Sequence, residues 1–340
     1  MKTLSVALLT ALLATVGLAQ NGPGYHVVKK TVVGGEGGWD YSYVDASARR
    51  VYVSHATKVV VLDADEVKVI GEIPNTEGVH GIAVAPEFNH GFTSNGRTST
   101  VSIFDLKTLK TIKEVPVTGR NPDAILYDPF SKHVFTFNGR SADATVLDAS
   151  SGDTLATIPL GGKPEFAVTD LNGHIYVNIE DKSEIAEIDS KTNVVQKRWS
   201  IAPGEEPSGL AFDVAHHRLF SVCDNKMMVV SDAEKGSVVT TVPIGNGPDA
   251  CKFDDGTQLV FSSNGEGTIT VIHEDAPDKY TVLETVATQR GARTMSVDIK
   301  THALFTTTAE FGETPKPTAE RPRPRPRMLP NTFVVLELQK

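Results

Sequence analysis

The chain has 340 residues, of which 22% are charged and 40% apolar, and its formal net charge is −9. This composition is ordinary for a globular protein and excludes a disordered polyelectrolyte. The acidic balance argues against a general nucleic-acid binder, and two cysteines are too few for a disulfide-rich scaffold or a four-cysteine zinc site.

Residues 1–19 have the pattern of a secretory signal peptide. Lys2 supplies a positive start, an apolar run broken only by Ser and Thr covers residues 4–16, and Gly17 and Ala19 place small residues before a cleavage site. The run is too short to span a membrane comfortably. We therefore expect cleavage after Ala19 and a periplasmic or secreted chain of residues 20–340.

One pattern of strands then recurs seven times. Each unit opens with a Gly/Pro-rich turn and an alternating strand, and these first strands end at residues 45, 85, 128, 170, 213, 254 and 298, spaced 40 to 44 residues apart. Second strands, rich in aromatic and β-branched residues, are expected at 52–55, 92–95, 135–138, 176–179, 220–223, 261–264 and 305–308. Third strands are expected at 59–62, 101–104, 144–147, 185–188, 227–230, 269–272 and 333–336, and fourth strands at 69–73, 111–115, 155–158, 194–199, 238–242 and 280–286.

Four antiparallel strands every 40 to 45 residues match the strand number and repeat length of a β-propeller blade. The seventh unit lacks a fourth strand, and residues 25–33, ahead of the first unit, are the candidate to replace it. Pairing them beside residues 333–338 would close the ring and remove an exposed edge. The sequence therefore predicts an all-β, seven-bladed propeller that forms one domain over residues 20–340.

An Arg/Pro-rich loop, residues 309–331, interrupts the seventh unit. In it Arg321, Arg323, Arg325 and Arg327 alternate with proline, which favours an extended polyproline II path. We expect the loop to project over the mouth of the channel. There it would form an electrostatic lid or meet an anionic partner, and a plain solvated loop is the alternative.

The aromatic-Val/Thr/Ser-x-Asn words of the second strands, together with the preceding Pro-Asp/Glu turns, resemble the YVTN/YncE-like family of seven-bladed propellers. The resemblance covers residues 25–340, and a lactonase-like branch of these propellers is nearby. It implies the fold, export, and binding of a ligand or partner. It implies no reaction, because the fold hosts many unrelated functions.

The third residue of each opening turn should line one mouth of the channel. These residues are Asp40, His80, Asp123, Glu165, Ser208, Asp249 and Arg293, and the ends of the second strands add His55, Asn95, Asn138 and Asn264. One interpretation is a metal site formed by Asp40, His80, Asp123, Glu165 and Asp249. The carboxylate oxygens favour Ca²⁺, whereas imidazole ligands favour Zn²⁺. His55 and His80 are the more specific candidate pair of imidazole ligands, because neighbouring blades could bring them together. The other interpretation is a ring of solvated turn residues.

Two functions follow. The first is a non-enzymatic binding or scaffolding protein that takes a small polar ligand, a metal or an envelope protein at the mouth. The second is a metal-assisted lactonase or ester hydrolase with an acidic site there. Whether the chain is an enzyme stays open, since it has no Gly-x-Ser-x-Gly elbow or phosphate loop. A disulfide between Cys223 and Cys251 is compatible with export, and two buried thiols are the alternative.

Overall fold

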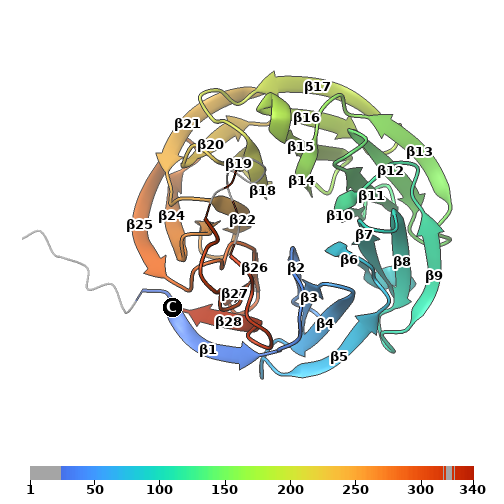
Figure 1. Ribbon diagram of the computed structural model, residues 1–340. Helices are drawn as coiled ribbons and strands as arrows, with labels where there is room; N and C mark the ends of the chain where they lie inside the picture. The colour runs from blue at the N-terminus through green and yellow to red at the C-terminus, as the bar shows by residue number, and fades with distance from the viewer. Residues whose placement is uncertain (1–23, 317, 319–323, 325) are drawn as a thin grey trace, which may run out of the picture.

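A computed structural model describes residues 24–316, 318, 324 and 326–340. Seven four-stranded antiparallel sheets, the blades, stand in a ring around a central axis (Figure 1). The predicted all-β, seven-bladed propeller is confirmed. The signal peptide expected over residues 1–19 lies outside the described residues.

Within blades 1 to 6, the strands run outward from the axis in chain order. Blade 1 holds β2 (Ser42–Asp45), β3 (Arg50–His55), β4 (Lys58–Asp63) and β5 (Val69–Pro74). Blade 2 holds β6 (Val79–Ala85), β7 (His90–Asn95), β8 (Thr100–Asp105) and β9 (Thr111–Pro116), with the short 3-10 helix η1 (Pro86–Phe88). Blade 3 holds β10 (Pro122–Asp128), β11 (His133–Asn138), β12 (Asp143–Asp148) and β13 (Thr154–Pro159). Blade 4 holds β14 (Pro164–Thr169), β15 (His174–Ile179), β16 (Glu184–Asp189) and β17 (Val194–Ser200), with η2 (Glu180–Lys182).

The remaining blades repeat this order. Blade 5 holds β18 (Pro207–Asp213), β19 (Arg218–Cys223), β20 (Met227–Asp232) and β21 (Ser237–Pro243). Blade 6 holds β22 (Pro248–Asp254), β23 (Leu259–Asn264), β24 (Thr268–Ala276) and β25 (Lys279–Ala287). In the part of the chain that is described, no helix is long and apolar enough to cross a membrane.

Blade 7 closes the ring by joining the two ends of the described chain. It consists of β26 (Met295–Val297), β27 (Leu304–Thr308), β28 (Val334–Gln339) and β1 (His26–Val32). Strand β1 pairs antiparallel with β28, with Thr31 opposite Val335 and His26 opposite Gln339. Because β28 is thereby hydrogen-bonded on both sides, the ring has no open seam, as the sequence predicted.

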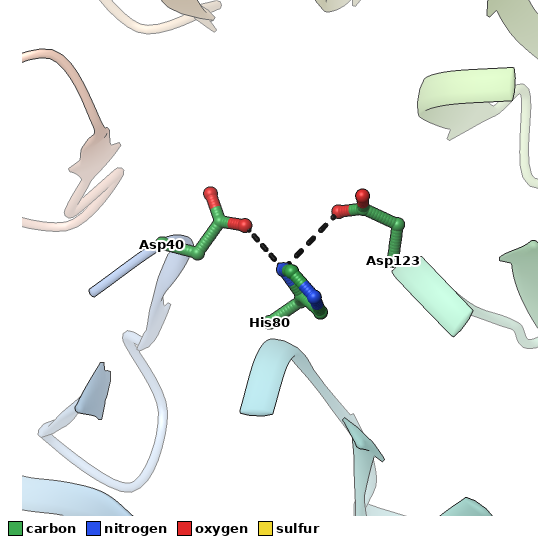
Figure 2. Close-up of side chains that lie close together, drawn as sticks. All are labelled: Asp40, His80 and Asp123. Atoms are coloured by element: carbon green, nitrogen blue, oxygen red, sulfur yellow. Dashed lines mark hydrogen bonds and ion pairs between the residues drawn. The ribbon is translucent and has the colours of Figure 1, made fainter. Parts of the chain in front are cut away.

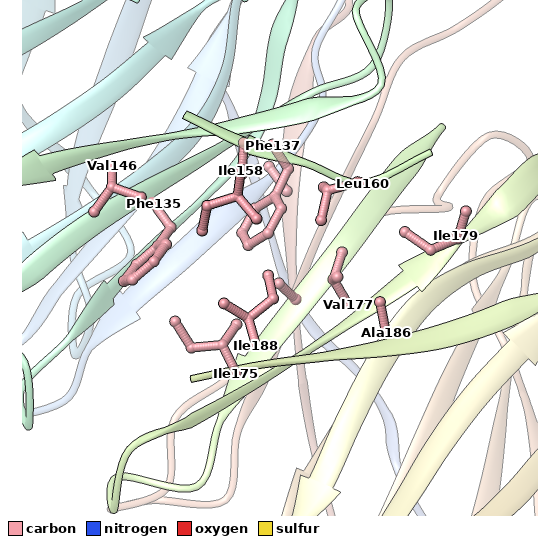
Figure 3. Close-up of a cluster of buried hydrophobic side chains, with 13 residues drawn as sticks. Phe135, Phe137, Val146, Ile158, Leu160, Ile175, Val177, Ile179, Ala186 and Ile188 are labelled. Atoms are coloured by element: carbon pink, nitrogen blue, oxygen red, sulfur yellow. The ribbon is translucent and has the colours of Figure 1, made fainter. Parts of the chain in front are cut away.

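Apolar side chains fill the space between neighbouring blades. Between blades 3 and 4, Phe135 and Phe137 of β11 pack with Ile158, Ile175 and Ile188 (Figure 3). Burial of each such side chain contributes about 1.5–3 kcal/mol, so the blades are held mainly by their faces and not by their loops. Six comparable clusters join other elements around the ring.

The ring has two ends, which we call the mouth face and the turn face. At the mouth face the inner strands begin, and at the turn face they end in the first hairpin of each blade. Aspartates at that hairpin accept hydrogen bonds from residues of the turn. Asp128, for example, accepts hydrogen bonds from the Ser131 amide (3.0 Å), the Ser131 hydroxyl (2.7 Å) and the Thr169 hydroxyl of the next blade (2.8 Å). These aspartates are Asp45, Asp128, Asp170, Asp213, Asp254 and Asp298.

Candidate functional site at the mouth face

Serines on second strands hold the start of the inner strands at the mouth face. Ser54 Oγ accepts the Asp40 amide at 2.8 Å, and Ser94 Oγ accepts the Gly81 amide at 2.9 Å. The Ser94 hydroxyl also donates to the carbonyl of Asp123 in the next blade. The serine of the repeated second-strand word therefore ties one mouth residue to its neighbour across a blade boundary.

Close backbone approach brings adjacent inner strands together. A Cβ on Gly209 of β18 would lie 2.4 Å from both the Asp249 carbonyl oxygen and the Cys251 amide nitrogen of β22. Glycine is required there because the neighbouring backbone occupies the place of a side chain. This approach sets Ser208 beside Asp249, and the Ser208 hydroxyl donates to Asp249 Oδ1 at 3.3 Å.

These residues surround a cavity of about 400 Å³, which we call the mouth cavity. It is strongly acidic, with seven carboxylates against two cationic side chains. Its lining includes six of the predicted mouth residues, Asp40, Asp123, Glu165, Ser208, Asp249 and Arg293. It also includes residues that the sequence reasoning missed, namely Tyr41, Lys163, Glu180, Glu206 and Asp224.

His80 lies between two carboxylates at one side of this cavity (Figure 2). Its Nδ1 is 2.5 Å from Asp40 Oδ2 and 3.6 Å from Asp123 Oδ1. Burial alone would lower the pKa of His80, but the hydrogen bond to Asp40 and the charge of Asp123 outweigh it and raise the pKa to about 9. His80 is therefore an imidazolium at neutral pH.

Asp123 and Glu165 are crowded acids. Burial and the charge of Asp40 raise the pKa of Asp123 to about 6, against the lowering effect of His80. Burial and the charge of Asp123 raise the pKa of Glu165 to about 8, although Lys163 Nζ lies 2.5 Å from Glu165 Oε1. Lys163 also contacts Glu180, so one ammonium serves two carboxylates. The cavity therefore has more carboxylates than its own cations can pair, and this crowding raises the pKa values of Asp123 and Glu165.

Tyr41 lines both the mouth cavity and a second, more apolar cavity of about 340 Å³ deeper along the axis. Its ring lies 5.5 Å from that of Phe166, and Lys252 Nζ lies 4.2 Å from the centre of the Phe166 ring. Burial lowers the pKa of Lys252 to about 8. A positive charge is therefore disfavoured in this deeper cavity and favoured in the acidic one beside it.

Five predicted mouth residues are not on the lining of the mouth cavity: His80, which lies at its side, and His55, Asn95, Asn138 and Asn264. His55 is 2% exposed and stacks on Phe333 at 4.2 Å, and burial with the charge of Lys58 lowers its pKa to about 4. The bonds of His80 go to aspartates, so the proposed imidazole pair is not formed. The three asparagines are buried and turn into their sheets, where their amides donate to third-strand side chains: Asn95 to Ser102, Asn138 to Thr145 and Asn264 to Thr270.

Cys223 and Cys251 are free, buried thiols, so the disulfide left open by the sequence is not formed. Burial raises the pKa of both to about 12, which makes them inert apolar packing groups. In the Arg/Pro-rich loop only Arg327 of the four arginines is described. Its carbonyl accepts the Gly312 amide at 2.9 Å, and its side chain is exposed. Arg321, Arg323 and Arg325 lie outside the described residues.

Comparison with known proteins supports the fold. No protein-family model and no curated protein sequence matches the chain. Among solved structures, the chain is similar to one of Kuenenia stuttgartiensis hydrazine synthase, with a TM-score of 0.69 and 16% sequence identity, covering 79% of this chain and 92% of that one. At this identity the likeness shows a shared propeller fold and says nothing of activity.

Proposed function

We propose that this protein is an exported, non-enzymatic binding propeller whose mouth cavity takes a small organic cation, such as a molecule that carries one or more amino groups. Export is supported by the leader pattern of residues 1–19, and membership of the YVTN/YncE-like propellers by the seven second-strand words in register. Amino-terminal sequencing of the secreted protein tests the first point, because the mature chain is expected to begin at Gln20.

The observation that carries the proposal is the excess of carboxylates on the mouth cavity, seven against the two cations Lys163 and Arg293. Arg293 Nη1 lies 3.4 Å from Asp249 Oδ1, and Lys163 is engaged by Glu165 and Glu180. A ligand ammonium would neutralise the surplus in a partly buried site, where charge interactions are stronger than in water. A volume of about 400 Å³ suits a small organic molecule better than a bare ion.

Calorimetric titration with 1,4-diaminobutane tests the proposal, with 1,4-butanediol as the uncharged control of equal length. We expect the diamine to bind and the diol not to bind. Glu165→Gln removes one charge-assisted contact and should weaken diamine binding roughly 10- to 100-fold. Glu114→Gln, on the exposed outer strand β9, is the matched control and should leave binding unchanged. Equal binding of diol and diamine would overturn the proposal.

A second function, metal-assisted hydrolysis of a lactone or ester, is favoured by one specific arrangement. Single ligand atoms of Asp40, His80 and Asp123 all lie within 4.8 Å of one another, and two carboxylates with an imidazole are a donor set suited to a divalent ion. Such an ion would polarise the substrate carbonyl and lower the pKa of a bound water. Glu165, with its pKa near 8, is placed in the same cavity to accept and return the proton.

Metal analysis of the purified chain, with a panel of γ- and δ-lactones, separates the two functions. For the hydrolase we expect one divalent ion per chain and lactone cleavage, both lost in Asp123→Asn and kept in Asp153→Asn, an exposed control. Absence of turnover across the panel with Zn²⁺, Mn²⁺ or Ca²⁺ supplied would eliminate the hydrolase. An anionic partner for the Arg/Pro-rich loop, and an envelope protein at the mouth face, remain further proposals for pull-down experiments.

A further inference from the structure

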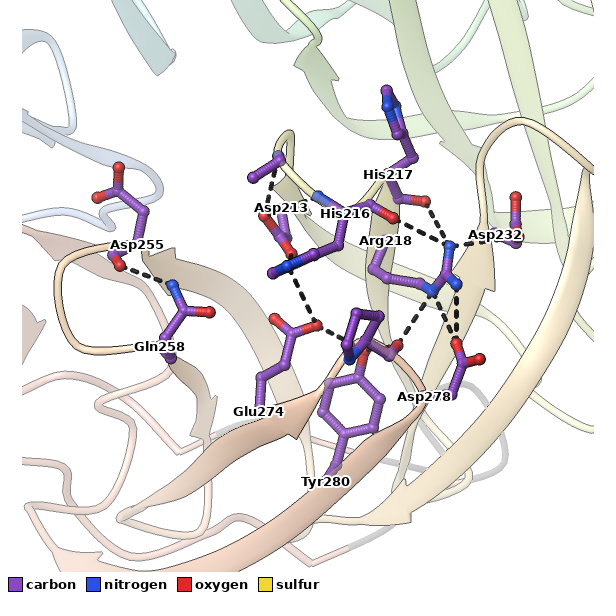
Figure 4. Close-up of polar contacts among 12 residues, drawn as sticks. Asp213, His216, His217, Arg218, Asp232, Asp255, Gln258, Glu274, Asp278 and Tyr280 are labelled. Atoms are coloured by element: carbon purple, nitrogen blue, oxygen red, sulfur yellow. Dashed lines mark hydrogen bonds and ion pairs between the residues drawn. The ribbon is translucent and has the colours of Figure 1, made fainter.

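A second group of titratable side chains lies on the turn face, where blades 5 and 6 meet (Figure 4). Asp213 ends β18, His216 lies in the turn that follows, and Glu274 belongs to β24 of the next blade. His216 Nδ1 is 2.6 Å from Asp213 Oδ2 and 3.9 Å from Glu274 Oε1. Single ligand atoms of the three residues all lie within 4.8 Å of one another.

Glu274 occupies a position that blades 1, 3 and 5 give to alanine, blade 4 to Ser190 and blade 2 to Leu106. Its amide donates to the Gln258 carbonyl, just as the amides of Ala64, Ala149 and Ala233 donate to the matching carbonyls of blades 1, 3 and 5. Those three alanines are fully or almost fully buried. Blade 6 therefore places a carboxylate where three other blades bury a methyl group, and Glu274 is itself only 4% exposed.

The Glu274 carboxylate is incompletely satisfied. The Tyr280 hydroxyl lies 3.2 Å from Oε1, but its single proton is shared with the Pro277 carbonyl, 2.6 Å away, and Oε2 is buried and has no hydrogen-bond partner. The neighbouring carboxylate of Asp213 is another acceptor, and ligand atoms of the two groups lie within 4.8 Å of one another. Two buried acceptors at this distance need a proton or a cation between them.

The nearest strong cation is engaged elsewhere. Arg218 Nη2 lies 2.8 Å from Asp278 Oδ1 and its Nη1 lies 3.2 Å from Asp232 Oδ2. No other arginine or lysine in the described part of the chain forms an ion pair with Asp213 or Glu274. The pair of carboxylates is thus left with His216, whose side chain is 42% exposed and leaves a path from solvent.

We propose that Asp213, His216 and Glu274 bind a divalent transition-metal ion, with Zn²⁺ the best fit, and that the ion fastens blade 5 to blade 6. One imidazole and two carboxylates are ligands that Zn²⁺ accepts, with a fourth position left to water. Ligand atoms of a tetrahedral zinc site lie about 3.3–3.5 Å apart, given bonds of about 2.0–2.2 Å. The 2.6 Å and 3.9 Å separations reach this range through side-chain shifts below about 1 Å.

This site is separate from the mouth cavity and does not depend on the function proposed for it. The test is elemental analysis of the full chain after dialysis against Zn²⁺, together with thermal unfolding with and without chelator. His80→Gln is used as the background, so that an ion at the mouth face does not contribute. We expect one Zn²⁺ per chain, a melting temperature that rises with Zn²⁺, and X-ray absorption that shows nitrogen and oxygen ligands without sulfur.

Glu274→Ala installs the residue that three other blades carry, so the variant should fold. It should lose the ion and the rise in melting temperature with Zn²⁺, and His216→Ala should weaken Zn²⁺ binding at least tenfold. His217→Ala, the exposed neighbouring histidine, should retain the ion. Retention of Zn²⁺ by Glu274→Ala, or no retained Zn²⁺ in the parent, would overturn the proposal and leave a shared proton as the link between Asp213 and Glu274.

Discussion

The mouth face and the turn face both carry aspartates at the ends of the inner strands, and Asp123 and Asp128, one from each face, have pKa values shifted in opposite directions. Asp128 on the turn face is fully buried, which alone would raise its pKa, but hydrogen bonds from Ser190, Ser131 and Thr169 hold the pKa below its usual range. Asp123 on the mouth face has a side chain that is 14% exposed and so still largely buried, and this burial with the charge of Asp40 raises its pKa. Donors, and not depth, separate a structural carboxylate from one that is ready for a ligand.

The largest expected effect is on the turn face. Asp128→Ala leaves the hydroxyl donors of Ser131 and Thr169 inside the protein without an acceptor. We therefore expect a loss of about 3 kcal/mol in the free energy of unfolding. Urea unfolding measures it. Asp153→Ala, an exposed aspartate of the same blade, is the control and should change stability by less than about 0.5 kcal/mol. A similar change in both variants would contradict a structural role for the turn carboxylates.

Lys252, between the two faces, gives a pH-dependent prediction. Because its folded-state pKa is about 8, below the value near 10.4 in an unfolded chain, its acetylation rate should rise with a midpoint near pH 8. By the same linkage, its contribution to stability increases as pH rises from about 8 to 10.4. Peptide mass spectrometry after brief acetic anhydride treatment measures the rate against exposed Lys107. A midpoint near 10 would show that burial does not perturb the amine.

A smaller effect is expected from Asp123→Asn. Removing this charge relieves the cost of its burial and its repulsion with Asp40 but loses its attraction to His80, so stability at pH 7.5 should stay within about 1 kcal/mol of the parent. The same urea experiment applies. A loss comparable to that of Asp128→Ala would place Asp123 among the structural carboxylates and would remove the distinction between the two faces.

The smallest effect is expected from shortening the Arg/Pro-rich loop. Its described ends hold each other, since Phe311 pairs with Met328 and the Leu329 amide donates to the Glu310 carbonyl at 2.8 Å. Replacing residues 315–325 by two glycines should therefore move the melting temperature by less than about 2 °C. A larger fall, measured by thermal unfolding beside the intact chain, would show that the loop is part of the packed structure.

The repeat predicted most of the fold, because seven units in register leave few ways to arrange 28 strands. The same register located Asp40, Asp123, Glu165 and Asp249 on the mouth cavity. It could not say which way a side chain turns at the end of a strand. His55 stacks on Phe333, a residue from the far end of the chain, and Asn95 turns to Ser102.

Residues missed at the mouth cavity carried a weak signal. Glu180 and Asp224 directly follow the second strands of blades 4 and 5, one position beyond the word that defines the repeat. A repeat motif defined one residue longer would have included both of these carboxylates. The cluster of Asp213, His216 and Glu274 could not be predicted from the sequence. It is recognised only when the position of Glu274 is compared across blades and when the contact of Glu274 with a tyrosine on the next strand is known.

The pairing of β1 with β28 makes the two ends of the chain one another's partners, from Val32 with Val334 to His26 with Gln339. Of the described strands, β1 is synthesised before all the others and pairs with β28, which is synthesised after them. A chain lacking β1 would expose β28 as an acceptor for any free strand. A synthetic peptide of residues 24–33, added to such a truncated chain, would serve as a donor strand, so the seam could carry a label or cargo attached after folding.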